Sequence, residues 1–324
     1  MTGRQRFRRT MGFERPDRVP YFEEGLRDEV LVQWHAQGLP LDADLAAMFR
    51  YDRRERIPVK LEPLPATRRL ARTGRGLREL ERRLDADDAA RLPADWPDRV
   101  DAWRRRRHVL ELPIHAGFFL TVGAEDWRRF TELMYLMHDR PGLVRAAMDL
   151  HARLSARLAD RILSQVRVDF VSFSEPIGGN EGPLLSARQY RQFVLESYGP
   201  ILEVLRRRRV ATVCMVTYAN ARPLVGAFLE AGFNCLWACE TAVEAMDYRG
   251  LRREFGRELR LIGGIDLDVL LEDKRAIRRE ILTKVPRLLA DGGYIPLADG
   301  RVRANVPWEN YVYYRRVLQE VTQG

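Results

Sequence analysis

The chain has 324 residues, of which 46% are hydrophobic and 31% are charged, and its formal net charge is +9 at pH 7. This composition is ordinary for a globular protein and excludes an intrinsically disordered chain. No run of about 18 apolar residues occurs, and the arginine-rich N-terminus has no apolar core, so we expect neither a membrane span nor a signal peptide. The expected protein is therefore cytoplasmic and has no membrane partner.

Arginine supplies nearly all of the positive charge, because the only lysines are Lys60, Lys274 and Lys284. The two densest arginine runs, 104–107 and 206–209, each precede an apolar segment, where cations complement the C-terminal dipole of a helix. These runs contain no interspersed aromatic residues and no known nucleic-acid-recognition motif, so we predict no nucleic-acid partner. The alternative is that the arginines surround the entrance of a cavity that binds an anionic small molecule.

The first third of the chain has an irregular pattern. Residues 18–24 and 108–115 predict strands, and residues 57–62 are a candidate for a further strand. Residues 65–107 are polar and rich in Arg, Asp and Pro, which favours a helical insertion in a single domain spanning residues 1–324.

From about residue 140 onward, helical patterns alternate with short β-like runs. Apolar residues from Leu143 to Ile162 recur at three- and four-residue spacing and predict a helix over 141–163. A helix from Ser186 onward contains Gly199-Pro200, a predicted kink or break. The other expected strands are 168–175, 212–220, 233–240, 259–266 and one after Gly293, and the other expected helices are 222–231, 247–256, 277–289 and 308–321. Such alternation is typical of repeated βα units around a parallel sheet.

Five of these strands end on a polar residue. In barrel enzymes the catalytic residues usually lie at the C-terminal ends of the strands. The five polar residues are Glu175, Asn220, Glu240, Asp266 and Asp299. The four carboxylates, joined by Glu24, form a candidate acid and cation-binding set in which mutual repulsion raises at least one pKa. The alternative is that they form salt bridges with Arg27, Arg222, Arg301 and Arg303.

Side-chain alternation assigns faces to the strand at 233–240. If Glu240 points into the barrel, Cys235 and Cys239 point toward the outer helices and are structural, and Cys214 lies on the opposite face from Thr217. Three cysteines are an odd number in a chain without an export signal, so we expect free thiols and no disulfide. We predict no metal site, with Mg²⁺ or Mn²⁺ on the carboxylates as the alternative.

Further substrate-binding candidates follow the strands. Tyr218, Asn220 and Arg222 lie in a strand-to-helix turn that could hold a carboxylate or carbonyl, although Asn220 could simply cap the helix. The glycine-rich loop that contains Asn180 could close over a ligand. His115 ends an early strand and is either an acid–base group or a structural histidine. The full predicted substrate-binding set is Glu24, Arg27, His115, Asn180, Thr217, Tyr218, Asn220, Arg222 and Arg301.

Several segments together resemble one superfamily. They are RVPYFEE (18–24), GPLLSARQYRQFVL (182–195), FLEAGFNCLWACE (228–240), LIGGIDLDVL (261–270) and GGYIPLADGRVRANVPWENY (292–311). The chain resembles uroporphyrinogen decarboxylase and its relatives, which include zinc-dependent corrinoid methyltransferases. The resemblance implies an α/β fold of the (β/α)8 TIM-barrel type, with the site at the C-terminal ends of the strands.

The chain departs from both enzyme branches of this superfamily. The arginine motif of the decarboxylase is replaced by EEGLRDE, which retains Arg27, and the positions of the methyltransferase zinc ligands hold Thr217, Ala219 and Gly300. The leading hypothesis is a carbon–carbon lyase without a cofactor that removes a carboxylate from a small organic acid other than uroporphyrinogen. Arg27, Arg222 and Arg301 would bind carboxylates, and Asp299 or Asp266 would supply the proton.

Two alternatives to this hypothesis stay open. One is a methyltransferase that uses a corrinoid partner or a divalent metal without the usual zinc ligands. The other is a non-catalytic ligand-binding barrel. A homodimer also stays open.

Overall fold

The computed structural model describes residues 1–67, 71–179, 181–218, 220–239 and 246–323. Its main sheet has seven strands in the order β1-β2-β3-β6-β7-β8-β9, and every neighbouring pair is parallel. The strands are β1 (Arg54–Arg56), β2 (Val109–His115), β3 (Phe170–Glu175), β6 (Val213–Tyr218), β7 (Cys235–Cys239), β8 (Arg260–Gly263) and β9 (Tyr294–Ile295). A small antiparallel hairpin, β4 (Gly178–Gly179) and β5 (Gly182–Pro183), follows β3.

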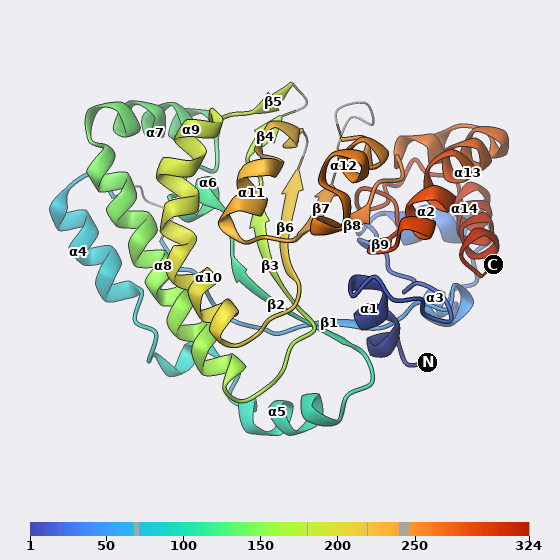
Figure 1. Cartoon of the computed structure of the whole chain (residues 1–324), viewed down its shortest axis with the longest axis horizontal. Helices are drawn as coiled ribbons and strands as arrows, with labels where there is room; N and C mark the ends of the chain where they lie inside the picture. The colour runs from blue at the N-terminus through green and yellow to red at the C-terminus, as the bar shows by residue number, and fades with distance from the viewer. Residues whose placement is uncertain (68–70, 180, 219, 240–245, 324) are drawn as a thin grey trace.

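Helices surround the outer face of the sheet (Figure 1). The long α8 packs beside α10, and α13 packs beside α14. The helices are α1 (Gly3–Met11), α2 (Val30–Ala36), α3 (Leu45–Met48), α4 (Gly74–Arg83), α5 (Trp96–Arg105), α6 (Phe118–Thr121), α7 (Trp127–Asp139), α8 (Pro141–Leu163), α9 (Ala187–Tyr190), α10 (Glu196–Arg207), α11 (Val225–Ala231), α12 (Tyr248–Phe255), α13 (Lys274–Asp291) and α14 (Trp308–Thr322). Shorter turns are η1 (Ala89–Arg91), the π-helical η2 (Arg191–Leu195), η3 (Arg222–Leu224), η4 (Gly256–Glu258) and η5 (Asp268–Leu271).

The two faces of the sheet have separate apolar cores. The outer face packs against the helices, and α8 contributes one buried stripe that includes Met148, Ala152 and Ile162. The inner face forms a cluster in which Phe7 and Met11 of α1 contact residues of the central strands. Since the backbone N–H of Arg4 donates to the carbonyl of Arg107, just before β2, α1 lies at the end of the sheet where the strands begin.

The N-terminal segment lies between the two ends of the curled sheet. The carbonyl of Tyr21 accepts from the backbone N–H of Asp52, beside β1. Further along the same segment, Arg27 donates to the carbonyl of Val302, and Val302 donates to that of Gly25. The chain therefore has an α/β fold with a curled parallel sheet that is compatible with a TIM-like barrel.

The structure differs from the predicted local structure at three places. Residues 18–24 and 57–62 are not strands, and the sheet contains β1 (Arg54–Arg56) instead. Gly199-Pro200 does not break the helix, because α10 continues through Pro200. Within the described residues, no helix is long and apolar enough to cross a membrane.

Candidate functional site

A cavity of about 420 Å³ opens at the carboxyl ends of the strands, and we call it the mouth cavity. Its volume lies within the range that suits a small organic ligand. Side chains that alternate along β3, β6 and β7 reach it, because every second residue of a strand points to the same face. Its charged and aromatic lining includes Glu24, Arg54, Arg56, Glu111, Tyr218 and Trp237.

Glu111 organises the charges of the mouth cavity. Its side chain is only 2% exposed, and its Oε2 accepts a hydrogen bond from Nη1 of Arg54 at 3.0 Å. Its Oε1 lies 3.2 Å from Nε of Arg56 and accepts from the hydroxyl of Ser172 at 2.6 Å. A buried carboxylate with two cations and a hydroxyl donor is well compensated, so Glu111 fixes the positions of both arginines.

The two arginines differ in how much of their guanidinium group remains available. Arg54 is mostly buried, and its guanidinium carbon lies 4.5 Å from the centre of the Trp237 ring. Arg56 has a side chain that is 60% exposed and contacts Glu111 through Nε. Its outer N–H groups therefore remain available to donate to a second carboxylate, a planar group that matches the guanidinium fork.

Glu24 is the second carboxyl group of the cavity, and its pKa is raised. Burial is the main cause, and the negative charge of Glu111 acts in the same direction. Arg54, Arg56 and Arg301 oppose the shift without cancelling it. A carboxyl group that holds its proton more tightly than usual beside two fixed cations is suited to general acid chemistry.

A separate buried polar cluster lies behind the wall of the cavity. Glu175 is fully buried and accepts from the backbone N–H of Phe118 at 2.8 Å and from the hydroxyl of Tyr198 at 2.6 Å. Burial raises the pKa of Glu175 to about 7. His115 lines the mouth cavity, but its Nδ1 accepts from the N–H of Gly117, and burial lowers its pKa to about 3. The imidazole is therefore neutral near pH 7.

The structure brings only some of the predicted site residues together. Glu24, His115 and Tyr218 line the mouth cavity. Glu175 and Thr217, paired neighbours on β3 and β6, have buried side chains on the other face of the sheet. Asn180 and Glu240 lie outside the described residues.

Four other predicted residues do not line the mouth cavity. Arg222 forms an ion pair with Glu254, and the side chain of Asn220 accepts from the backbone N–H of Arg222. The guanidinium of Arg301 donates to the carbonyl of Leu26, and the backbone of Arg27 pairs with Val302.

Asp266 and Asp299 follow the paired residues Ile265 and Ala298 at the same edge of the sheet. The carboxylate of Asp299 accepts from the N–H of Leu267, and that of Asp266 accepts from the N–H of Asp268. Burial raises the pKa of Asp266. The roles predicted for both residues stay predictions.

The face assigned to the cysteines was inverted. Trp237 lines the mouth cavity, so Cys235 and Cys239, two residues away on either side, also point inward. Both pack with Cys214 in the inner apolar cluster. The prediction that Cys235 and Cys239 face the outer helices was therefore wrong.

Zinc, which the methyltransferase resemblance implies, does not fit the donors that the structure describes. Cys214, Cys235 and Cys239 are buried among apolar side chains, and burial raises the pKa of Cys214 well above its usual value. Among the described residues, no group of three His, Cys, Asp or Glu side chains has the arrangement of a metal site.

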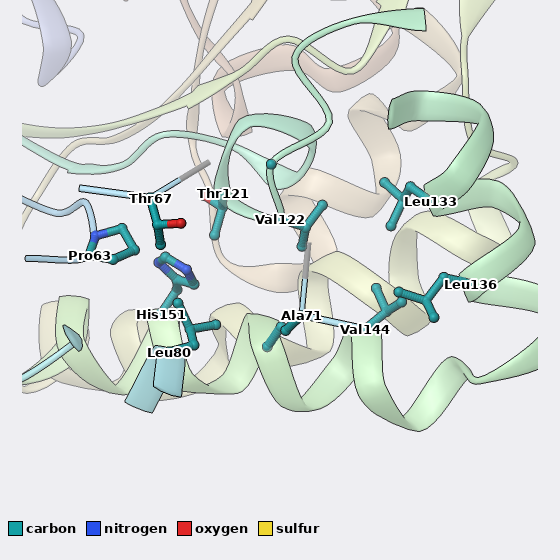
Figure 2. A pocket seen from close by; sticks show the side chains of 12 residues that line it. Pro63, Thr67, Ala71, Leu80, Thr121, Val122, Leu133, Leu136, Val144 and His151 are labelled. Atoms are coloured by element: carbon teal, nitrogen blue, oxygen red, sulfur yellow. The ribbon is translucent and has the colours of Figure 1, made fainter. Parts of the chain in front are cut away.

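A second hollow lies outside the sheet, beside α4, α7 and α8. Figure 2 shows the ring of His151 at one end of it and Leu133 and Leu136 at the other. Its volume is about 20 Å³, which is room for a water molecule and not for an organic ligand. Burial lowers the pKa of His151 to about 4. This hollow is therefore not a candidate substrate site.

Comparison with known proteins identifies the family. The family model described as uroporphyrinogen decarboxylase (URO-D) matches residues 120–311, which is more than half of the chain. The chain belongs to the uroporphyrinogen decarboxylase family. The match covers β3, β6, β7, β8 and β9.

The solved structures agree on the fold. Among 26 matching chains is a methyltransferase from Methanosarcina mazei, with a TM-score of 0.64 and 15% sequence identity over 99% of both chains. At this identity the likeness shows the fold alone. None of the curated proteins compared with the chain matches it.

Proposed function

We propose that the protein is a carbon–carbon lyase that decarboxylates a small organic acid in the mouth cavity. The observation that carries the proposal is the pair Arg54 and Arg56, fixed by Glu111 on the inner face of the sheet. The exposed guanidinium of Arg56 binds a substrate carboxylate, and Trp237 provides an apolar surface for the body of the substrate. Membership of the uroporphyrinogen decarboxylase family supports this reaction class.

Glu24 supplies the proton in this proposal. Decarboxylation breaks the bond between the substrate carbon and its carboxylate, releases CO₂ and leaves the electron pair on carbon. A proton must then be added to that carbon, and Glu24 lies in the same cavity with a raised pKa. Asp266 and Asp299, at the neighbouring edge of the sheet, are the alternative acids.

The proposed scaffold is a closed (β/α)8 barrel in a single domain. Residues 21–27, which hydrogen-bond toward β1 on one side and to Val302 on the other, would fill the position of the eighth strand without forming a regular strand. The helices between residues 65 and 107 would then be an insertion that leaves the barrel intact.

The test begins with the ligand. Native mass spectrometry of the purified protein identifies any organic acid that copurifies, and a panel of small carboxylic acids is assayed for CO₂ release in D₂O. The proposal expects one CO₂ and one deuterium, bound to the carbon that lost the carboxylate, for each turnover. Glu24→Gln is expected to lower kcat by about a hundredfold or more, whereas Glu230→Gln, an exposed glutamate paired with Arg191, leaves it unchanged. Retained turnover in Glu24→Gln together with loss in Asp266→Asn or Asp299→Asn would reassign the acid.

Methyl transfer is the second candidate, because the fold is shared with a methyltransferase. It predicts transfer of an isotopically labelled methyl group to a thiol or corrinoid acceptor without CO₂ release. The same D₂O experiment separates the two candidates. If neither CO₂ nor methyl transfer is found for an acid that binds in the cavity, the non-catalytic binding protein becomes the better account.

A further inference from the structure

A second large cavity lies at the opposite end of the strands from the mouth cavity. Its volume is about 450 Å³. Its walls come from α1, from the segments that lead into β3 and β6, and from Arg260 at the start of β8. Figure 1 shows α1 at the end of the sheet where these strands begin. We call this space the basal pocket.

The basal pocket is lined by six arginines and one carboxylate. The arginines are Arg4, Arg8, Arg167, Arg208, Arg209 and Arg260, and the carboxylate is Asp169. Asp169 is buried and already bonded to Arg4 at 2.9 Å and to Arg106 at 2.9 Å. The pocket therefore has a large excess of positive charge over its own anions.

Four of the six arginines have no carboxylate partner among the described residues. Arg208 pairs with Asp160 at 2.7 Å, and Arg4 pairs with Asp169. Arg260 is partly buried and donates only to the backbone carbonyls of Met11 and Asn234. Burial lowers its pKa, which is the response of a cation without a nearby anion.

The other three come from separate elements. They are Arg8 on α1, Arg167 before β3 and Arg209 after α10. Cations that converge from separate elements can contact several charged oxygens of one ligand at the same time.

Arg209 occupies a position that normally favours glycine. It follows the C-terminus of α10 with a φ of 55°, in the left-handed region. Val210 donates to the carbonyl of Leu205 and Arg209 donates to that of Arg206, which is the Schellman pattern that usually has glycine here. An arginine at this position costs local stability, and its side chain lines the basal pocket.

We propose that the basal pocket binds a small polyphosphate anion, such as a di- or triphosphate chain. Guanidinium groups bind phosphate oxygens in pairs, and several arginines match a ligand that carries several charges along a short chain. The pocket volume suits a small molecule. The simpler interpretation is that the arginines only offset the dipoles of α1, α8 and α10, whose C-termini lie here.

Arg209→Gly separates these two interpretations. Glycine relieves the left-handed backbone, so the variant should fold with a Tm at or above that of the parent. The ligand site should lose affinity for tripolyphosphate by about tenfold, because a charge-assisted contact is removed. Arg206→Ala is the matched control: it removes the same charge at the same helix end, pairs with Glu203 and does not line the pocket.

The experiment is isothermal titration calorimetry of the full chain with tripolyphosphate, pyrophosphate and citrate at fixed salt. The proposal expects tripolyphosphate to bind more tightly than citrate, a loss of affinity in Arg209→Gly and in Arg8→Ala, and parent-like affinity in Arg206→Ala. It is overturned if the parent does not bind tripolyphosphate, if Arg206→Ala weakens binding as much as Arg209→Gly, or if citrate binds equally well. Tighter binding of an oligonucleotide than of tripolyphosphate would also overturn it, in favour of a nucleic-acid surface.

Discussion

Replacing Glu175 by glutamine should flatten the pH dependence of folding stability. Glu175 is completely buried, and no cation is among the causes of its raised pKa, which is due to burial. Glutamine retains one oxygen, which accepts from the N–H of Phe118, and its amide nitrogen takes the place of the other oxygen and donates to the hydroxyl oxygen of Tyr198. The shape of the side chain is therefore preserved while the ionisation is removed.

The direction of the effect follows from the two pKa values. The carboxyl has a pKa near 4.5 when unfolded and about 7 when folded. Its stabilising contribution is fully present below the unfolded pKa, is lost as the pH rises through the folded pKa, and does not change further above it. The difference between the unfolded and folded pKa values corresponds to about 3 kcal/mol of unfolding free energy.

Urea unfolding at pH 4.5 and pH 8 measures this difference. Between these two values the parent should lose about 3 kcal/mol more stability than Glu175→Gln, after the smaller effects shared by both proteins cancel. Glu230→Gln is the control, because this side chain is 66% exposed and should change the difference by less than about 0.5 kcal/mol. An equal pH response in parent and Glu175→Gln would refute the raised pKa of this buried carboxyl group.

Two further predictions concern the inside of the protein. Arg315 is fully buried against Glu23, so Arg315→Met should lower the free energy of unfolding by about 3–5 kcal/mol in urea titrations. Arg316 is exposed, so Arg316→Met should change the free energy of unfolding by less than about 0.5 kcal/mol. Equal effects of the two substitutions would contradict the buried ion pair. The three cysteines are buried and the pKa of Cys214 is raised, so a chromogenic disulfide reagent should label no thiol in the native protein and three in denaturant. Fast native labelling would show that the inner cluster is open.

Local patterns in the sequence predicted most of the elements from residue 140 onward. The apolar stripe from Leu143 to Ile162 belongs to α8, Pro141–Leu163, as expected from its three- and four-residue spacing. The strand predicted at 168–175 is β3, Phe170–Glu175, because the segment is short and rich in Val and Phe, which favour strands. These elements are determined by periodicity within one segment, which a single sequence contains.

The charged residues of the mouth cavity could not be predicted in the same way. Arg54 and Arg56 belong to a strand of only three residues, RER, whose composition resembles a loop. Their charge is compensated by Glu111, which is far away in the sequence and is itself held by a hydrogen bond from Ser172. The sole local signal was the alternation of Arg54 and Arg56 around Glu55, which is weak over three residues.

The predicted substrate-binding arginines did not include Arg54 and Arg56, because the direction of an arginine side chain depends on its distant neighbours. Arg222 follows a strand end, and sequence reasoning placed it near the substrate, but its ion pair is with Glu254 on α12. The direction of a long side chain after a strand depends on which neighbour offers a counter-ion, and that neighbour is not defined by local pattern. Which residues of β7 point inward was likewise determined by packing around Trp237.

Titration of the substrate acid into Arg56→Met and Arg222→Met tests the central claim most directly. Both variants remove one arginine with similar side-chain length, but only Arg56 lines the mouth cavity. Calorimetry should show affinity lower by about tenfold to a hundredfold in Arg56→Met, since a charge-assisted contact to the carboxylate is lost, and unchanged affinity in Arg222→Met. Parent-like binding by Arg56→Met together with weakened binding by Arg222→Met would contradict the assignment of the carboxylate site to the arginines held by Glu111.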